Sequence, residues 1–188
     1  MSVRHQIHEC DGMYFITFTC YNWLPLFEIA NGYHLVYEQF NYLKSCGHSI
    51  AGYVIMPNHV HALIHFADTD KKVNTIVGNM KRFLAYSLVK ELHRQHKTDI
   101  LKLLAQGVNK TDRSRGKLHE VFEPSFDCKY CYGDNFIEQK LNYIHNNPVK
   151  GKWQLAESTV EYPHSSACFY TEGQQGVYEV TSYKCIGE

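Results

Sequence analysis

The sequence predicts an α+β fold in which helices pack on an antiparallel sheet. Residues 14–20 alternate with the period of two that marks a strand. Two further apolar runs, 50–56 and 60–66, are joined by a short turn, as in a β-hairpin. Segments with helical periodicity lie before and after this hairpin. The chain of 188 residues can bury a sizeable core, so we expect one domain over 1–188 with a C-terminal extension from about residue 152.

The first strand and the first helix follow from periodicity. Tyr14, Ile16 and Phe18 alternate with Thr17 and Thr19, which predicts a half-buried strand. Between residues 31 and 46, apolar residues recur every three or four positions, as one face of a helix requires. The members of that face are Tyr33, Val36, Tyr37, Phe40 and Leu43. We expect Gly47 to end this helix.

The hairpin and a long helix come next along the chain. Pro57 and Asn58 separate the two β-branched runs and supply turn-compatible chemistry. An apolar stripe then predicts a helix over 73–96. This stripe consists of Val73, Ile76, Val77, Met80, Leu84, Leu88 and Leu92. The basic residues Lys81, Arg82, Lys90 and Arg94 are expected to lie outside it.

The last third of the chain contains a loop, a strand and a helix. Residues 106–117 hold only one strongly apolar residue and predict a mobile basic loop. Val121–Tyr132 is predicted to return as a strand. A final helix from about Asp134 must stop near Pro148, whose ring and missing N–H oppose its continuation. The predicted order is therefore strand, helix, strand, strand, helix, strand, helix.

Charge is distributed unevenly along a chain whose formal net charge is zero. Residues 71–117 hold twelve basic side chains and only three acidic ones. A basic middle of this kind fits either a polyanion-binding face or an ordinary solvated helix and loop. The basic residues are Lys71, Lys72, Lys81, Arg82, Lys90, Arg94, Lys97, Lys102, Lys110, Arg113, Arg115 and Lys117.

Composition excludes several classes of protein. The content of 44% hydrophobic and 20% charged residues is that of an ordinary globular chain, not of a disordered one. No run of 18 apolar residues exists, and Met1–Cys10 has no apolar core for a secretion signal, so we expect a cytoplasmic protein without a membrane segment. Seven scattered cysteines indicate free thiols. Cys128 and Cys131 have the spacing of zinc ligands, but no second such pair accompanies them.

The segment 58–65 contains the first candidate metal ligands. His59, His61 and His65 share one face of the predicted strand, so two imidazoles at i and i+2 can approach one ion. A His-hydrophobe-His triplet also arises by chance in a chain with twelve histidines, and a pair of surface or hydrogen-bonded histidines is the alternative.

Further candidates lie on the last predicted helix. Tyr143 and Asn147 are four residues apart and share one helix face, where the Asn147 amide oxygen could join a metal. Imidazole and oxygen ligands suit Mn²⁺ or Mg²⁺ and would also accept zinc. A tyrosine hydroxyl is a weak nucleophile unless a base or a cation favours its ionised form. By spacing alone, one tyrosine among fourteen is more often a packed helix residue than a nucleophile.

Three motifs together resemble a known family. Met56-Pro57-Asn58-His59-Val60-His61 is followed by Tyr143-Ile144-His145-Asn146-Asn147-Pro148 and by Tyr162-Pro163-His164-Ser165-Ser166-Ala167. From about residue 12 to residue 170 the chain resembles the REP-associated tyrosine transposases (RAYT). These belong to the HUH (His-hydrophobe-His) single-tyrosine superfamily of transposases and nucleases. The resemblance implies a ferredoxin-like HUH nuclease fold.

The resemblance also implies a role for each matching residue. His59, His61 and Asn147 would hold a divalent cation, Mg²⁺ or Mn²⁺. Tyr143 would attack a DNA phosphate, become linked to the 5′ end and release a 3′ hydroxyl. Because the phosphotyrosine linkage conserves the phosphodiester energy, a second 3′ hydroxyl can rejoin the DNA, and no nucleotide cofactor is needed. Transposition and recombination of DNA are the corresponding reactions.

Partners follow from the same family. Its members recognise imperfect hairpins of repetitive extragenic palindromes with a short single-stranded tag, so single-stranded or hairpin DNA is the expected partner. Phosphate contacts are expected in the basic stretch, with Lys81 and Arg82 as the first choices. The REP-associated branch favours a monomer over a homodimer.

The sequence departs from the family in places, and two other functions compete. Lys150-Gly151-Lys152-Trp153 and His164 differ from the usual residues, and the segment 98–120 is longer than usual, which affects substrate specificity more than activity. A domesticated DNA-hairpin-binding protein without turnover is the first alternative. A zinc hydrolase that uses His59, His61 and a third histidine such as His65 is the second.

Overall fold

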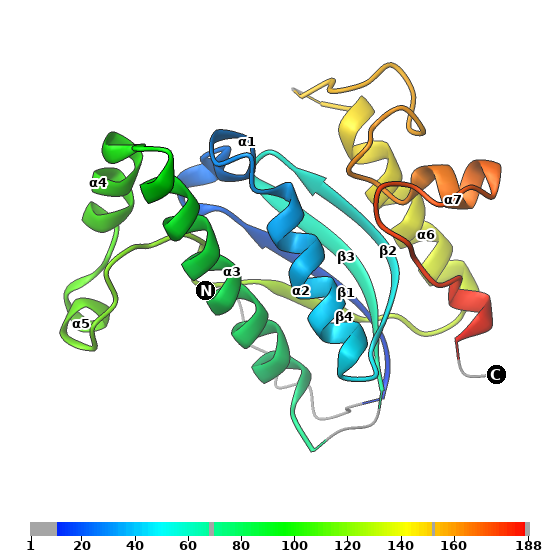
Figure 1. Ribbon diagram of the computed structural model, residues 1–188. Coiled ribbons are helices and arrows are strands. Elements are labelled where there is room, and N and C mark those ends of the chain that lie inside the picture. The colour runs from blue at the N-terminus through cyan, green and yellow to red at the C-terminus, as the bar shows by residue number, and fades with distance from the viewer. Residues whose placement is uncertain (1–10, 68–69, 152, 187–188) are drawn as a thin grey trace.

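A four-stranded antiparallel sheet forms the centre of the protein, as seen in a computed structural model that describes residues 11–67, 70–151 and 153–186 (Figure 1). The strands are β1 (Gly12–Thr19), β2 (Ser49–Met56), β3 (His59–Phe66) and β4 (Asp127–Tyr130). They are arranged in the order β2-β3-β1-β4. The β1-helix-β2 connection with β3 between its two strands is the split arrangement of a ferredoxin-like fold, and the predicted α+β class is confirmed.

Strand register places the ends of β1 and β3 together. β1 pairs with β3 from Gly12 opposite Phe66 to Thr19 opposite His59. Pro57 and Asn58 form the turn between β2 and β3, which confirms the predicted hairpin. The start of β3 therefore lies beside the end of β1, and side chains from both strands can meet there.

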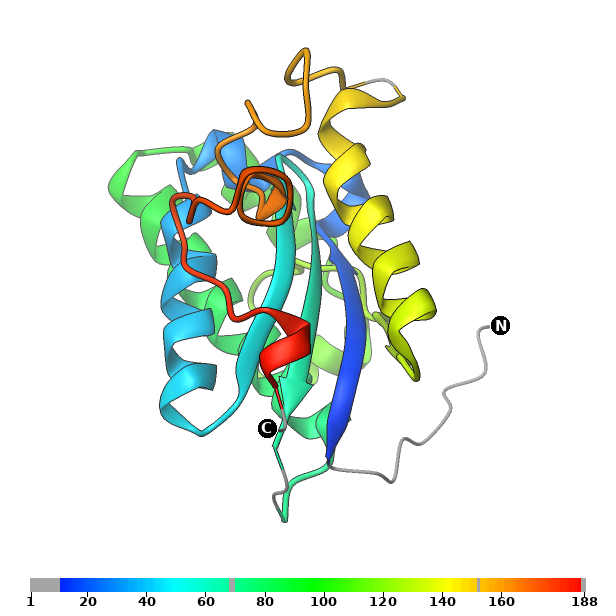
Figure 2. The same ribbon diagram turned by 90° about the vertical axis from the view of Figure 1, so that its right-hand side faces the viewer.

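Two helices cover one face of the sheet, α2 (Tyr33–Ser45) and α3 (Val73–Arg94) (Figures 1 and 2). Their apolar stripes pack on the alternate strand residues Tyr14, Ile16 and Phe18. Both helices match the prediction, although α3 ends two residues earlier than expected. Gly47, at φ +89, follows the end of α2 in the left-handed conformation that glycine adopts without strain.

Helix α6 (Asp134–Asn146) covers the opposite face of the sheet (Figure 2). Met13, Phe15 and Leu63 are buried beneath it, so β1 is covered on both faces and is not the half-buried strand that its pattern predicts. The helix lies very close to β2, since a Cβ on Gly52 would stand 2.5 Å from Cδ2 of Leu141. Glycine at this position thus permits the close approach of α6.

The segment between α3 and β4 differs from the prediction. The expected mobile loop over 106–117 is wrong for half of its length, because α5 (Lys110–Ser114) and the last residue of α4 (Thr98–Gln106) lie in it, to one side of the sheet (Figure 1). Leu101 and Leu104 anchor α4 in the core, and Asn109 caps α5 through its side chain. The strand predicted over Val121–Tyr132 is reduced to β4, because Pro124 has no N–H to donate to a sheet.

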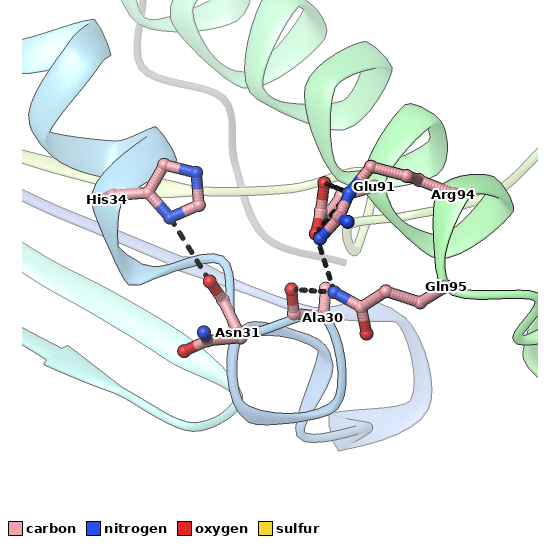
Figure 3. Close-up of polar contacts among 6 residues, drawn as sticks. All are labelled: Ala30, Asn31, His34, Glu91, Arg94 and Gln95. Atoms are coloured by element: carbon pink, nitrogen blue, oxygen red, sulfur yellow. Dashed lines mark hydrogen bonds and ion pairs between the residues drawn. The ribbon is translucent and has the colours of Figure 1, made fainter.

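A polar set fastens the end of α3 to the turn before α2 (Figure 3). Gln95 donates from Nε2 to the Ala30 carbonyl oxygen at 2.7 Å and to Oε1 of Glu91 at 2.6 Å. Arg94 pairs with the same Glu91 carboxylate. These contacts hold the end of α3 against the turn before α2. Both helices lie on the face of the sheet opposite to α6 (Figure 2).

Shorter elements complete the described chain: η1 (Tyr21–Trp23), α1 (Leu26–Ile29), η2 (Asn147–Val149), α7 (Ala167–Glu172) and η3 (Tyr183–Cys185). The predicted C-terminal extension begins at residue 152, which lies outside the described ranges, as do Met1–Cys10. The part that follows packs back on the domain, since Tyr162 and Tyr170 donate their hydroxyls to carbonyl oxygens of β2. No helix in the described ranges is long and apolar enough to span a membrane.

Candidate functional site

His59 and His61 lie side by side on the face of β3 that α6 covers. Their ring centroids are 4.7 Å apart, and both side chains are buried, with 7% and 4% of their surface exposed. The alternation of β3 sends Val60 and Ala62 into the core on the other face, as predicted. Two imidazoles are thereby fixed next to each other by the strand itself.

Asn58 fixes the orientation and tautomer of His59. The Asn58 side chain donates from Nδ2 to the Trp23 carbonyl oxygen at 3.2 Å, so its Oδ1 faces Nδ1 of His59 at 2.7 Å. Because an amide oxygen only accepts, Nδ1 of His59 must carry the proton. The lone pair of His59 then resides on Nε2, as a metal ligand requires.

Thr17 holds His61 in a similar way. Its Oγ1 lies 2.7 Å from Nδ1 of His61, and the two residues are direct partners in the β1–β3 ladder. Phe15 stacks on the same imidazole at a centroid distance of 5.5 Å. With Nδ1 engaged by the hydroxyl, Nε2 is the ring nitrogen that can bind a ligand.

Burial keeps both imidazoles neutral. It lowers the pKa of His59 to about 4, against a smaller raising effect of the hydrogen bond with the Asn147 side chain. Burial also lowers the pKa of His61 to about 3, and repulsion by the protonated form of His59 and by Lys140 adds to this effect. Neutral imidazoles at neutral pH have the lone pairs that metal coordination needs.

Helix α6 brings Tyr143 to the histidine pair. Its ring lies edge-on to His61 at a centroid distance of 5.1 Å and to Phe15 at 5.9 Å. The side chain is 52% exposed. Tyr143 therefore packs its ring on the site and keeps about half its surface open to solvent, unlike the core tyrosines such as Tyr14.

Asn147 reaches the same place one turn later. It follows the last residue of α6, yet its φ of −58° and ψ of −45° are helical, and the chain continues as the 3-10 turn η2. Pro148 is accommodated early in that turn, where its fixed φ suits a helical conformation. The proline thus ends α6 without withdrawing Asn147, whose side chain hydrogen-bonds His59.

The Ser-Ser-Ala motif anchors α6 to the sheet. Ser166 Oγ lies 2.9 Å from Nε2 of His145, which is buried on α6, and accepts a hydrogen bond from the Tyr53 backbone N–H at 3.0 Å. The Ser166 backbone N–H in turn donates to the Tyr53 carbonyl oxygen. This link fixes the helix that carries both Tyr143 and Asn147.

Lys140 adds a positive charge to the site. It lies one turn before Tyr143, and its ammonium group is 5.0 Å from the centroid of the Phe15 ring and 4.9 Å from that of Phe136. Its charge also lowers the pKa of His61. A cation held over two aromatic rings beside the histidine pair suits an anionic ligand.

Other candidate ligands lie apart from this site. His65 is paired with Asp11 at 3.3 Å, and no group of three His, Cys, Asp or Glu residues suited to a metal forms in the described part of the chain. The zinc hydrolase that would use His59, His61 and His65 thus finds no support. Cys128 and Cys131 are free thiols whose pKa values are raised by burial.

Lys81 and Arg82 lie on the opposite face of the sheet, on α3. Lys81 is buried, contrary to its predicted place outside the apolar stripe, and donates to the carbonyl oxygens of Glu123 at 2.9 Å and Ser125 at 3.3 Å. Arg82 lines a cleft of about 700 Å³ between α3 and residues 115–124. Lys90 and Arg115 line the same cleft, which gives it a basic character.

Sequence reasoning found His59, His61, Tyr143 and Asn147, and the structure brings these four together. It did not predict the contacts of the residues that support them, namely Thr17, Asn58, Trp23, Lys140 and Ser166, although Asn58 and Ser166 belong to the sequence motifs. The sequence predicts a turn at Asn58 but not its hydrogen bond to His59. A signal for Lys140 does exist, since it precedes Tyr143 by three positions and so lies on a neighbouring turn of the same helix.

The chain is similar in sequence to a bacterial protein and in fold to a solved transposase structure. No family model matches the chain. An uncharacterised protein of Haemophilus influenzae is 26% identical over 157 residues, which is 78% of this chain and 86% of that protein. The solved structure of a REP-associated tyrosine transposase bound to a REP hairpin superimposes with a TM-score of 0.63 at 16% identity. The match covers 89% of this chain and 83% of that one, so the chain shares the fold of that transposase.

Proposed function

We propose that the chain is a metal-dependent endonuclease and transposase that cleaves and rejoins single-stranded DNA at hairpin, REP-like sequences. One observation carries the proposal: Tyr143, half exposed, lies against the buried imidazole of His61, which is itself paired with the buried imidazole of His59, and the Nδ1 atoms of both histidines are engaged. A tyrosine that only packs its ring in the core would be buried and would not require oriented histidines beside it. The shared fold with a transposase that was solved on a REP hairpin supports the same substrate class.

The donor set fits a divalent cation. Nε2 of His59 and Nε2 of His61 are the candidate ligand atoms, and the Asn147 side chain, which hydrogen-bonds His59, would give up that bond to bring its amide oxygen to an ion. Two imidazoles with an amide oxygen suit Mg²⁺ or Mn²⁺ when waters and phosphate oxygens complete the shell. When bound, such an ion supplies Lewis-acid stabilisation of the charge that develops on the phosphate oxygens.

Tyr143 supplies the nucleophile. Its hydroxyl oxygen forms a bond to phosphorus while the bond from phosphorus to the 3′ oxygen breaks, and the 3′ oxygen gains the proton that the tyrosine loses. The strand then ends in a 5′-phosphotyrosine and a free 3′ hydroxyl. Attack by a 3′ hydroxyl on this linkage reverses the step, so strands are rejoined without a nucleotide cofactor.

Several side chains of this protein orient the reaction. Phe15 and His61 hold the Tyr143 ring, and the Ser166 contact with His145 fixes the helix behind it. Lys140 places a positive charge where a phosphate would approach. On the other face, we propose that Arg82 contacts DNA phosphates in the basic cleft. Lys81, which the sequence also predicts as a phosphate contact, already binds two carbonyl oxygens with its ammonium group.

A monomer is sufficient for this chemistry in our proposal. The α6 helix of the chain brings Tyr143 to His61 of the same chain. No exchange of the tyrosine helix between two copies is required to complete the set of four residues.

The test uses a labelled single-stranded oligonucleotide that folds into a hairpin with an unpaired tail. The protein and its Tyr143→Phe variant are incubated with it and Mn²⁺ or Mg²⁺, and products are separated on a denaturing gel. We expect a cleaved strand and a covalent adduct with the unmodified protein alone, and neither after chelation. Cleavage that persists in Tyr143→Phe would refute the mechanism. Hairpin binding without cleavage by the unmodified protein would instead favour a domesticated binding protein.

A further inference from the structure

Trp23 is exposed beside the histidine pair. Its side chain is 59% accessible, although tryptophan is usually among the more buried residues. Its ring lies 6.2 Å from the His59 ring at an angle of 67°. A large aromatic surface thus stands open to solvent next to a proposed metal ligand.

The backbone around Trp23 is held in an unusual conformation. Asn22 and Trp23 both have positive φ angles, 50° and 57°, which L-residues other than glycine rarely adopt. Three hydrogen bonds fix this turn. The Asn22 N–H donates to the Glu123 carboxylate at 2.8 Å, the Trp23 N–H donates to the Cys20 carbonyl oxygen at 3.0 Å, and Asn58 donates to the Trp23 carbonyl oxygen at 3.2 Å.

The last of these bonds connects Trp23 with the site. The same Asn58 amide that accepts from His59 donates to the Trp23 backbone. Asn58 is fully buried, so little water can compete for its side chain. The Trp23 backbone is therefore linked to His59 through one side chain. Such a link is expected where a bound ligand must be positioned relative to the reacting atoms.

We propose that Trp23 is the stacking platform for an unpaired nucleobase that flanks the scissile phosphate. Every nucleobase has an aromatic face, and stacking on exposed aromatic side chains is how proteins hold single strands beside a reactive centre. This inference rests on the proposed function, because it requires a single-stranded substrate at the histidine site.

Tryptophan fluorescence tests the proposal without cleavage. Trp23 and Trp153 are the two tryptophans of the chain, so Trp153→Phe leaves Trp23 as the sole reporter. In a Trp153→Phe, Tyr143→Phe protein, we expect the hairpin oligonucleotide with its unpaired tail to quench this fluorescence. A scan of single abasic positions through the tail should find one or two positions where the quenching is lost.

Affinity provides a second readout, measured by fluorescence anisotropy of the labelled oligonucleotide in the Tyr143→Phe background. We expect Trp23→Ala to weaken binding by about 10-fold, since one base–aromatic stack contributes a factor of about 5 to 150. Trp23→Tyr should restore most of the affinity. Tyr42→Ala, which removes an equally exposed aromatic from α2, should have no effect. Thermal melting of each variant verifies that it is folded.

The outcomes separate this inference from the proposed function. DNA binding with unquenched Trp23, or Trp23→Ala binding as tightly as its parent, overturns the stacking platform, whatever the cleavage assay shows. Quenching localised to tail bases supports it even if no strand is cut, which would refute only the nuclease. Absence of all DNA binding by the unmodified protein overturns both.

Discussion

Asn58→Ala is expected to weaken metal binding although Asn58 touches no metal. The substitution removes the acceptor that lies 2.7 Å from Nδ1 of His59 and so fixes the tautomer of that ring. It also removes the donor to the Trp23 carbonyl oxygen. His59 then becomes free to rotate or to exchange its proton between the two nitrogens, and only one of these states presents Nε2 as a ligand.

The magnitude follows from the contact of Asn58 with His59, which we propose as a metal ligand. Loss of a hydrogen-bond partner of a metal-binding histidine typically costs about 10- to 100-fold in metal affinity. This range corresponds to about 1.4 to 2.7 kcal/mol of binding free energy. Because Asn58 is fully buried, water cannot readily replace its oxygen, and we expect the upper half of the range. Asn58→Asp keeps an acceptor for His59 and should bind metal more tightly than Asn58→Ala.

Titration calorimetry of the DNA-free protein with Mn²⁺ measures this effect directly. Asn135→Ala, at an exposed position near the start of α6, is the matched control and should bind as the unmodified protein does. Equal Mn²⁺ affinity for Asn58→Ala and its parent, with both proteins folded by circular dichroism, would refute the argument that Asn58 prepares His59.

Three further predictions concern the stability of the metal-free protein. Burial lowers the folded pKa of His145 to about 4, below its unfolded value of about 6.5, so its contribution is fully present above about pH 6.5 and disappears as pH falls toward 4. Urea unfolding at stepped pH should show a loss of up to about 3 kcal/mol from this group, and His145→Gln should reduce the slope. Ser166→Ala removes the hydrogen-bond partner of the Tyr53 N–H and of His145. We expect it to lower the free energy of unfolding by about 1–3 kcal/mol. The control Ser114→Ala, at an exposed position, should change this free energy little. Lys81→Met keeps the aliphatic stem but removes the ammonium group that binds two carbonyl oxygens. We expect the free energy of unfolding, measured in urea, to fall by about 1–2 kcal/mol. An unchanged free energy of unfolding would contradict a structural role for Lys81.

The main architecture was accessible from the sequence because its elements have strong periodicity. The hairpin of β2 and β3, helix α3 and helix α6 lie close to their predicted bounds. The helices between 98 and 114 were missed because the composition of 106–117 indicates a loop, and the residues that tie the segment to the core are few, chiefly Ile100, Leu101 and Leu104. The extent of β4 was overestimated because aromatic content alone does not show where Pro124 interrupts pairing.

The sequence predicts each pair of candidate site residues, but not the packing that joins the two pairs. Alternation in β3 correctly placed His59 and His61 on one face, and helical spacing placed Tyr143 and Asn147 together. Bringing the two pairs together depends on the packing of α6 on the sheet through Gly52 and Ser166, a tertiary contact that no local pattern encodes. Lys81 shows the opposite error, since its charge predicted exposure while backbone carbonyl oxygens from residues 123 and 125 hold it inside.

The location of the covalent link to DNA tests the central claim most directly. The protein is trapped with a hairpin oligonucleotide and Mn²⁺, digested with protease and nuclease, and its peptides are analysed by mass spectrometry for a nucleotide joined to tyrosine. Of the fourteen tyrosines, we predict that Tyr143 alone carries the adduct, through a 5′ phosphate. An adduct on another tyrosine, or strand cleavage with no protein adduct, would contradict the assignment of Tyr143 as the nucleophile beside His59 and His61.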